Sequence, residues 1–160
     1  MQRRSFLRAA GAVPLLAGAV PAARAHHGWS GFDAERPLYL EGRAAKVRWA
    51  NPHAEIELDV APEPRLPADL KQRALPAQTA QVDGAALLAR AQLPTRRDRR
   101  WTVELAPLTR LQAWRLEEIA PGTPLSVVGY TFAGERGDAV LRAEYVFVGG
   151  KAYGLRSSPA

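Results

Sequence analysis

Apolar and polar positions alternate over residues 38–60 in the way that predicts a β-hairpin. The second half of this stretch is the more regular, because aliphatic and acidic residues alternate there without a break: Ile56, Leu58 and Val60 against Glu55, Glu57 and Asp59. A strand places such alternating residues on opposite faces of a sheet. The first half, residues 38–49, contains Gly42, which suits a bulge or a sharp coil. Ala50 and Asn51 form the expected turn.

The C-terminal half of the chain predicts three more strands and a helix. Trp101, Val103 and Leu105 alternate with polar residues and indicate the third strand. Residues 124–132 and 139–148 indicate the fourth and fifth. The helix between the third and fourth strands is expected to run over residues 109–119. Thr109 and Gln112 have the spacing of a capping box at its start, and Pro121 and Gly122 stop it.

Residues 61–100 have a different composition, rich in proline, alanine and glutamine. We interpret this segment as an insertion after the second strand, with a short helix near residues 84–92 that begins at Asp83. The segment is expected to add little to the core, so that deletion of residues 62–94 should leave the rest folded. Its last residues, 95–100, form a basic run that is either a solvated loop or a surface for an acidic partner.

The predicted order of elements favours an all-β fold. Three strands, a helix and two further strands are typical of a small five-stranded Greek-key barrel of the OB (oligonucleotide/oligosaccharide-binding) type. The alternative is an open β-sandwich with one covering helix. Residues 26–160 are long enough for one domain with one core.

The first 25 residues resemble a twin-arginine export signal. Arg3 and Arg4 are followed by Ser-Phe-Leu-Arg and then by an apolar stretch interrupted by glycine and proline. This stretch is too short and too broken to span a bilayer, which takes roughly 20 apolar residues. Residues 23–25 read Ala-Arg-Ala, a small-x-small cleavage pattern. We expect cleavage after Ala25 and a periplasmic protein; the alternative is a retained membrane anchor.

Removal of this leader changes the charge of the chain. Four of the 22 basic residues and none of the 16 acidic residues lie in the first 25 positions, so the mature chain carries 18 basic residues and a net charge of +2 in place of +6. A nucleic-acid partner is therefore not expected. The chain has no cysteine, and its one methionine is Met1. The mature protein thus lacks the sulfur ligands of Cu(I) and iron–sulfur sites.

Three motifs give the chain a family resemblance. They read HHGWSGFDAERPLYLEG, KVRWANPHAEIEL and LQAWRLEEIAPGTPLSVVGY. Together they resemble the exported bacterial proteins grouped as domain-of-unknown-function family 6152. The resemblance implies export and a small β domain, and it implies no established activity.

The three histidines of the chain are the candidate metal ligands. Cleavage after Ala25 makes His26 the amino terminus, where its amine and imidazole can chelate one metal ion. His53, which follows Pro52 in the hairpin turn, would add a second imidazole and complete a histidine brace. Nitrogen ligands in a planar array favour Cu(II). Cleavage one residue earlier would instead place His27 third, and a terminal Ala-His-His chelates Cu(II) without help from the fold.

Several other residues have simpler interpretations. The acidic row of residues 55–59 is read as an ordinary solvated face, with Glu55 paired to Lys46 across the hairpin. Five aromatic residues are expected to pack in the core and at the barrel ends: Trp29, Phe32, Trp49, Trp101 and Trp114. No nucleophile elbow and no phosphate loop are present.

These observations leave three functional hypotheses open. The first is a non-enzymatic periplasmic protein that binds Cu(II) or another divalent metal through His26, His27 and His53. The second is a structural or interaction module that binds a protein partner through residues 61–100. The third is a copper-dependent oxidase, for which the sequence shows no substrate surface. The oligomeric state is not indicated.

Overall fold

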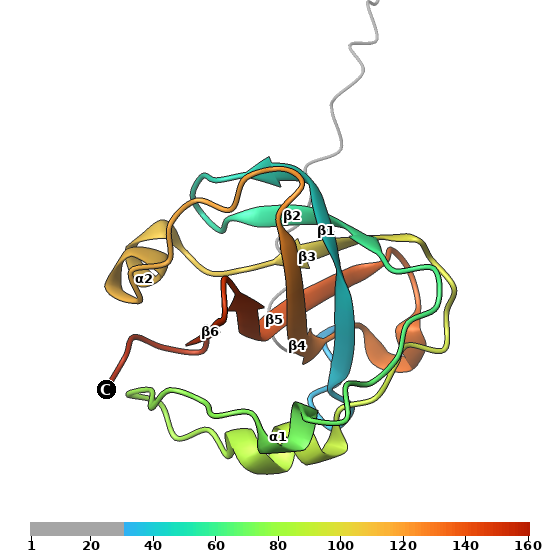
Figure 1. Cartoon of the computed structure of the whole chain (residues 1–160), viewed down its shortest axis with the longest axis horizontal. Coiled ribbons are helices and arrows are strands. Elements are labelled where there is room, and N and C mark those ends of the chain that lie inside the picture. Colours follow the sequence, from blue (N-terminus) through green and yellow to red (C-terminus); the bar gives the residue numbers. More distant parts are fainter. Residues whose placement is uncertain (1–30) are drawn as a thin grey trace, which may run out of the picture.

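The computed structural model describes residues 31–160, which are mostly β-structure. Figure 1 shows strands that wrap around one another, with short helices at the periphery. The strands are β1 (Leu38–Arg48), β2 (Glu55–Val60), β3 (Arg100–Glu104), β4 (Pro124–Tyr130), β5 (Val140–Val148) and β6 (Lys151–Gly154). The helices are α1 (Gly84–Arg90) and α2 (Leu108–Ala113), together with the 3-10 turns η2 (Leu70–Gln72) and η3 (Ala133–Glu135).

The first five strands close into a barrel. The sheet order is β3-β2-β1-β4-β5-β6, and an additional pairing of β3 with β5 joins its two sides. That closing pair is parallel and matches Thr102 with Val140 and Glu104 with Arg142. The strand β6 pairs only with β5, as the second arm of a hairpin. The sequence predicted five strands, and β6 is a sixth that its short, partly exposed pattern did not reveal.

The predicted hairpin of β1 and β2 is present, but its register differs from the predicted pairing of Lys46 with Glu55. Ile56, Leu58 and Val60 point into the core, as predicted. The ladder slips between Ala44 and Lys46, so that Lys46 lies opposite Glu57 and not opposite Glu55. The ion pairs on the outer face are accordingly Lys46–Glu57, Arg48–Glu55 and Arg100–Asp59.

Gly42 has a different role from the predicted bulge. It lies two residues before Ala44, where the register shift begins. It pairs with Val60 of β2 on one side and with Leu125 of β4 on the other. A Cβ at this position would overlap the carbonyl oxygen of Asp59. Glycine is therefore needed here because β2 approaches β1 closely, which sharp coiling of a small barrel requires.

The helix α2 is shorter than predicted and is capped differently. It starts at Leu108, whose amide donates to Asn51 Oδ1 in the β1–β2 loop at 3.3 Å. The residue that precedes the helix makes no side-chain capping hydrogen bond, so the predicted Thr109–Gln112 capping box does not form. Arg115 has a φ of 53°, and Leu116 N donates to Leu111 O, which ends the helix in a Schellman motif. Ile119 reaches the core from the segment after the helix, which has no regular secondary structure.

The barrel interior holds the main hydrophobic core. Its inward residues come from all five barrel strands, with Trp101, Ile56, Leu58, Val127 and Leu141 each at most 1 % exposed. Of the aromatic residues expected to pack, Trp101 lies in this core, and Trp49 and Trp114 pack against it partly buried. Trp29 lies outside the described residues.

A second hydrophobic cluster lies outside the barrel, and it corrects the interpretation of residues 61–100. Four hydrophobic residues of this segment are buried, namely Leu70, Leu87, Leu88 and Ala91. They pack on the outward-facing side chains of β1, β4 and β5, which are Tyr39, Val128, Tyr130 and Tyr145. Figure 1 shows α1 along this side of the barrel. The expectation that the segment adds little to the core is wrong, because it forms a second layer that covers this face.

The C-terminal tail fastens this layer. Thr79 N donates to Ser158 O at 3.0 Å, and Gln78 forms an isolated bridge with Pro159. The indole of Trp114 donates to Ser157 O at 2.8 Å. The short helix α1 starts as predicted, with the Asp83 carboxylate accepting from Ala86 N at 2.9 Å.

We predict that Leu88→Ala lowers the free energy of unfolding by about 2–5 kcal/mol, because it leaves a cavity between the outer layer and the barrel. Leu88 is 1 % exposed. The matched control is Leu66→Ala in the same segment, where the side chain is 43 % exposed and the change should stay within about 0.5 kcal/mol. Denaturant unfolding measures both. Equal, small effects would restore the interpretation of the segment as an accessory loop.

Candidate functional site

Of the three predicted metal ligands, one lies within the described residues. His26 and His27 lie outside the described residues. His53 lies in the β1–β2 loop and is half-buried, and its carbonyl oxygen accepts from Arg48 Nη2 at 3.0 Å. Within residues 31–160, no three histidine, cysteine or carboxylate side chains come close enough together to hold a metal ion.

A path of contacts across the barrel connects the start of the described chain with β2, the strand that follows His53. The backbone of Phe32 bridges to Phe132, and the Arg142 guanidinium lies 4.4 Å from the centre of the Phe32 ring. Arg142 donates to Glu104 at 2.7 Å. Glu104 is the register partner of Glu55, which follows His53 by two residues. The barrel closure therefore brings the entry of the chain within a few strand spacings of the His53 loop.

The acidic row and two arginines of the basic run, Arg96 and Arg100, form ion pairs within the chain. Asp59 accepts from Arg100 Nε at 2.7 Å, a hydrogen bond that lowers the pKa of the Asp59 carboxyl. Arg96 in the basic run binds Asp98 at 2.6 Å, and this hydrogen bond raises the pKa of its guanidinium. Arg96 also donates to the carbonyl oxygen of Gly137 at 3.0 Å. These contacts favour the solvated-loop interpretation of residues 95–100.

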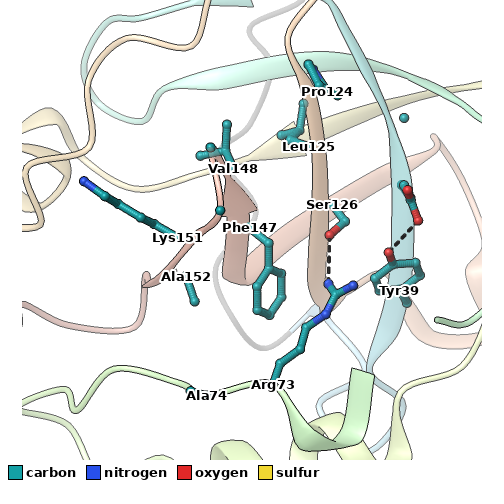
Figure 2. Close-up of a pocket in the computed structure, with 14 residues that line it drawn as sticks. Tyr39, Arg73, Ala74, Pro124, Leu125, Ser126, Phe147, Val148, Lys151 and Ala152 are labelled. Atoms are coloured by element: carbon teal, nitrogen blue, oxygen red, sulfur yellow. Dashed lines mark hydrogen bonds between the residues drawn. The ribbon is translucent and has the colours of Figure 1, made fainter. Parts of the chain in front are cut away.

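A pocket of about 670 Å³ lies where the outer layer stops short of covering the barrel. Its floor is the outer face of β1, β4 and β5, and its walls are residues 73–74 and the β5–β6 hairpin (Figure 2). The lining residues are Tyr39, Glu41, Gly42, Arg73, Ala74, Pro124, Leu125, Ser126, Phe147, Val148, Gly149, Gly150, Lys151 and Ala152. The pocket therefore combines apolar, cationic and hydrogen-bonding groups, and we refer to it as the Arg73 pocket.

Arg73 is held in this pocket by four neighbours. Its Nε donates to Asp69 Oδ2 at 3.1 Å, and its Nη1 donates to Ser126 Oγ at 3.3 Å. The guanidinium carbon lies 5.0 Å from the centre of the Phe147 ring and 6.0 Å from that of Tyr39. Arg73 follows η2, which Leu70 anchors in the outer cluster. Although burial opposes it, the hydrogen bond to Asp69 raises the pKa of the Arg73 guanidinium, so this group stays charged.

Tyr39 and Glu41 form a second fixed pair on the floor. Both side chains lie on the outer face of β1, and Tyr39 Oη donates to Glu41 Oε2 at 2.7 Å. Burial, assisted by the hydrogen bond to Glu41, raises the pKa of Tyr39 to about 12. The phenol therefore keeps its proton and donates to the carboxylate throughout the neutral range.

Sequence reasoning missed the residues of the Arg73 pocket, although two signals were present. Tyr39 and Glu41 stand two positions apart in a strand and share its outer face. Ser126 is a polar residue inside the apolar run of β4, and it is 7 % exposed. Arg73 had no such signal, because its place depends on how the outer layer folds back on the barrel.

We predict that the protein loses stability between about pH 10 and pH 12 in a way that Tyr39→Phe partly removes. In this range the unfolded chain releases the Tyr39 proton while the folded chain keeps it, so the free energy of unfolding falls as the pH rises, by about 2 kcal/mol in total. Denaturant unfolding from about pH 9 upward measures the slope. Identical slopes for Tyr39→Phe and wild type would contradict the prediction.

Comparison with known proteins identifies one family. Residues 13–66, about a third of the chain, match the model of a family of unknown function, DUF6152. The match includes β1 and β2, and it supports the resemblance that the motifs indicated. No curated protein and no solved structure matches the chain. No helix within residues 31–160 is long and apolar enough to cross a membrane. The chain is thus similar, over its N-terminal third, to the DUF6152 family, for which no function is established.

Proposed function

We propose that the protein is an exported, non-enzymatic binding protein whose mature N-terminal histidine, together with His27 or His53, binds Cu(II). The observation that carries the proposal is the position of Phe32 relative to the His53 loop. Phe32 follows His26 by six positions, and an extended chain of that length reaches at most ~20 Å. The path from Phe32 through Arg142 and Glu104 to Glu55 crosses strands only about 5 Å apart. A reach equal to several strand spacings supports the proposal that His26 approaches His53.

The ligand chemistry supports Cu(II) over other metals. An N-terminal histidine offers an amine and an imidazole, and deprotonation of an amine with a pKa near 8 by a metal costs little at neutral pH. His53 would add an imidazole from a folded loop. Cu(II) heads the divalent affinity order and accepts planar nitrogen ligands. A brace of this kind uses His26 and His53, whereas a chelate formed after earlier cleavage uses His27.

The scaffold for this function is, in our proposal, an OB-type barrel. Five strands pair in the cyclic order β1-β2-β3-β5-β4, and α2 lies between β3 and β4, an arrangement that supports this assignment. OB folds often bind nucleic acid over the second and third strands. Here that face carries the ion pairs Arg48–Glu55, Lys46–Glu57 and Arg100–Asp59, so it has no excess of positive charge to attract phosphates. We therefore propose no nucleic-acid partner.

The second candidate function is an interaction module in which the histidines have no role. One observation favours it: Leu66, in the proline-rich stretch before η2, is 43 % exposed, and it is the large hydrophobic side chain that stands out as exposed within residues 31–160. A single exposed leucine is a small surface for a protein partner, so we rank this function second.

We predict that the double variant Arg3→Lys, Arg4→Lys remains in the cytoplasm as the uncleaved precursor, because twin-arginine export depends on the arginine pair. Cell fractionation and intact-mass measurement check the location and the amino terminus together. A double variant that reaches the periplasm normally would show that the general secretion route is used. A mature terminus other than His26 would exclude the brace.

We predict that protein starting at His26 binds about one Cu(II), and binds it more tightly than Zn(II). His53→Ala should weaken binding, because it removes the ligand that the fold supplies. One alanine added before His26 should weaken a brace, since the amine and the imidazole then belong to different residues, whereas it should strengthen a third-position chelate. Calorimetric titration without an N-terminal tag measures all three proteins.

His27→Ala is the matched control for this experiment. It should leave a brace of His26 and His53 intact, and it should abolish the tight binding of the alanine-extended protein. Equal and weak copper binding by every variant would exclude both metal models, and the interaction module would then replace them.

A further inference from the structure

The Arg73 pocket has the features of a built binding site, and it does not involve the histidines. Its charged groups are held in place before any ligand arrives, because Asp69, Ser126, Phe147 and Tyr39 fix the guanidinium of Arg73. Figure 2 shows this guanidinium on the floor of the pocket, directed toward Ser126 and β4. A pocket of about 670 Å³ is within the usual range for small organic ligands.

The guanidinium provides donors for an anion. It carries five N–H groups in a planar fork, of which Nε is used by Asp69 and one on Nη1 by Ser126. The remaining donors belong to Nη1 and Nη2, which suit the two oxygens of a carboxylate. Lys151 in the β5–β6 hairpin also lines the pocket, and its side chain is directed away from Arg73 (Figure 2), so Arg73 is the cation that faces a ligand.

The acidic groups limit the charge of the ligand. Asp69 is bound to Arg73, and Glu41 lines the pocket beside Tyr39. The two carboxylates balance the two cations, so the site does not favour a strongly charged anion such as phosphate. Tyr39 occupies one oxygen of Glu41, and the carboxylate has further lone pairs that a ligand hydroxyl can use as an acceptor.

The remaining lining is apolar. Phe147 and Ala152 line the pocket from β5 and β6, and Ala74 lines it from the outer layer, while Leu125 and Val148 border it from the barrel core cluster. These surfaces would be desolvated by an apolar body of the ligand. The ligand therefore needs three parts: one carboxylate, one hydrogen-bond donor and one apolar group.

We propose that the Arg73 pocket binds a small organic monocarboxylate that carries a hydroxyl group and an apolar body. The carboxylate accepts hydrogen bonds from Arg73, the hydroxyl donates to Glu41, and the apolar body lies against Phe147. Binding is reversible and involves no covalent step.

The test compares three probes: mandelate, phenylacetate, which lacks only its hydroxyl, and benzyl alcohol, which lacks only its carboxylate. Calorimetry is carried out in the presence of EDTA, so that a failure of the copper proposal does not affect the result. Mandelate should bind more tightly than phenylacetate, and benzyl alcohol should bind weakest because it lacks the carboxylate. Inorganic phosphate should compete poorly. No binding of mandelate at millimolar concentration, or equal binding of mandelate and benzyl alcohol, would overturn the proposal.

Variants locate the binding in the pocket. Arg73→Gln should weaken mandelate binding by roughly ten- to a hundredfold, since hydrogen bonds from a charged donor are lost. Arg73→Lys keeps the charge without the fork and should have an intermediate effect. Arg65→Gln is the control, because Arg65 lies in the same segment with an 83 % exposed side chain and does not line the pocket.

A second variant separates binding from folding. Glu41→Gln changes an exposed side chain, so the protein should remain folded, as thermal unfolding will verify. This variant should reduce the preference for mandelate over phenylacetate, and it should not weaken phenylacetate binding, because the carboxylate that is removed repels an anion. An unchanged preference in Glu41→Gln would overturn the role of the hydroxyl, and unchanged binding in Arg73→Gln would overturn the site.

Discussion

Closure of the barrel through β3 and β5 is the constraint on which the rest of the structure depends. Three residue pairs form this parallel contact, and the last of them adds a nearly buried ion pair in which Arg142 donates to Glu104 at 2.7 and 3.0 Å. Loss of either partner would leave a charge buried without its counterion, which is strongly destabilising. The same Arg142 covers the ring of Phe32, so closure also fixes where the described chain enters the fold. The proximity of that entry to the His53 loop follows from this contact.

The regular parts of the fold could be predicted because local patterns determined them. Strict alternation over Glu55–Val60 identified β2 and its buried face, and the Asp83 cap identified the start of α1. The prediction failed where non-local contacts decide. The first helix amide of α2 is satisfied by Asn51, which is 57 residues away and which no local capping pattern could indicate. In residues 61–100 the leucines are spaced among prolines and alanines and show neither the strand period nor that of a long helix, which predicts an accessory segment. In the structure, however, Leu70 and Leu88 are buried against the barrel.

The two candidate sites also differ in whether the local sequence indicates them. The histidines attract notice in the sequence because they are few and two of them are adjacent, and only His53 falls within the described residues. The Arg73 pocket is assembled from four separate stretches of the chain, and its central cation comes from the stretch with the least regular pattern. Sequence spacing carries no information about such a juxtaposition, since it arises when the outer layer folds over β1, β4 and β5.

The outer layer contains a stretch that is less constrained than the barrel strands. The barrel strands must keep their register, and at Gly42 even one added Cβ would overlap the neighbouring strand. The stretch around Pro62–Pro67 is largely exposed, apart from the partly buried Pro67. Leu70, which follows it, anchors the wall that carries Arg73 in the outer cluster. Insertions or deletions in this stretch would therefore change the length of an exposed loop and leave both the closed sheet and the Arg73 pocket in place.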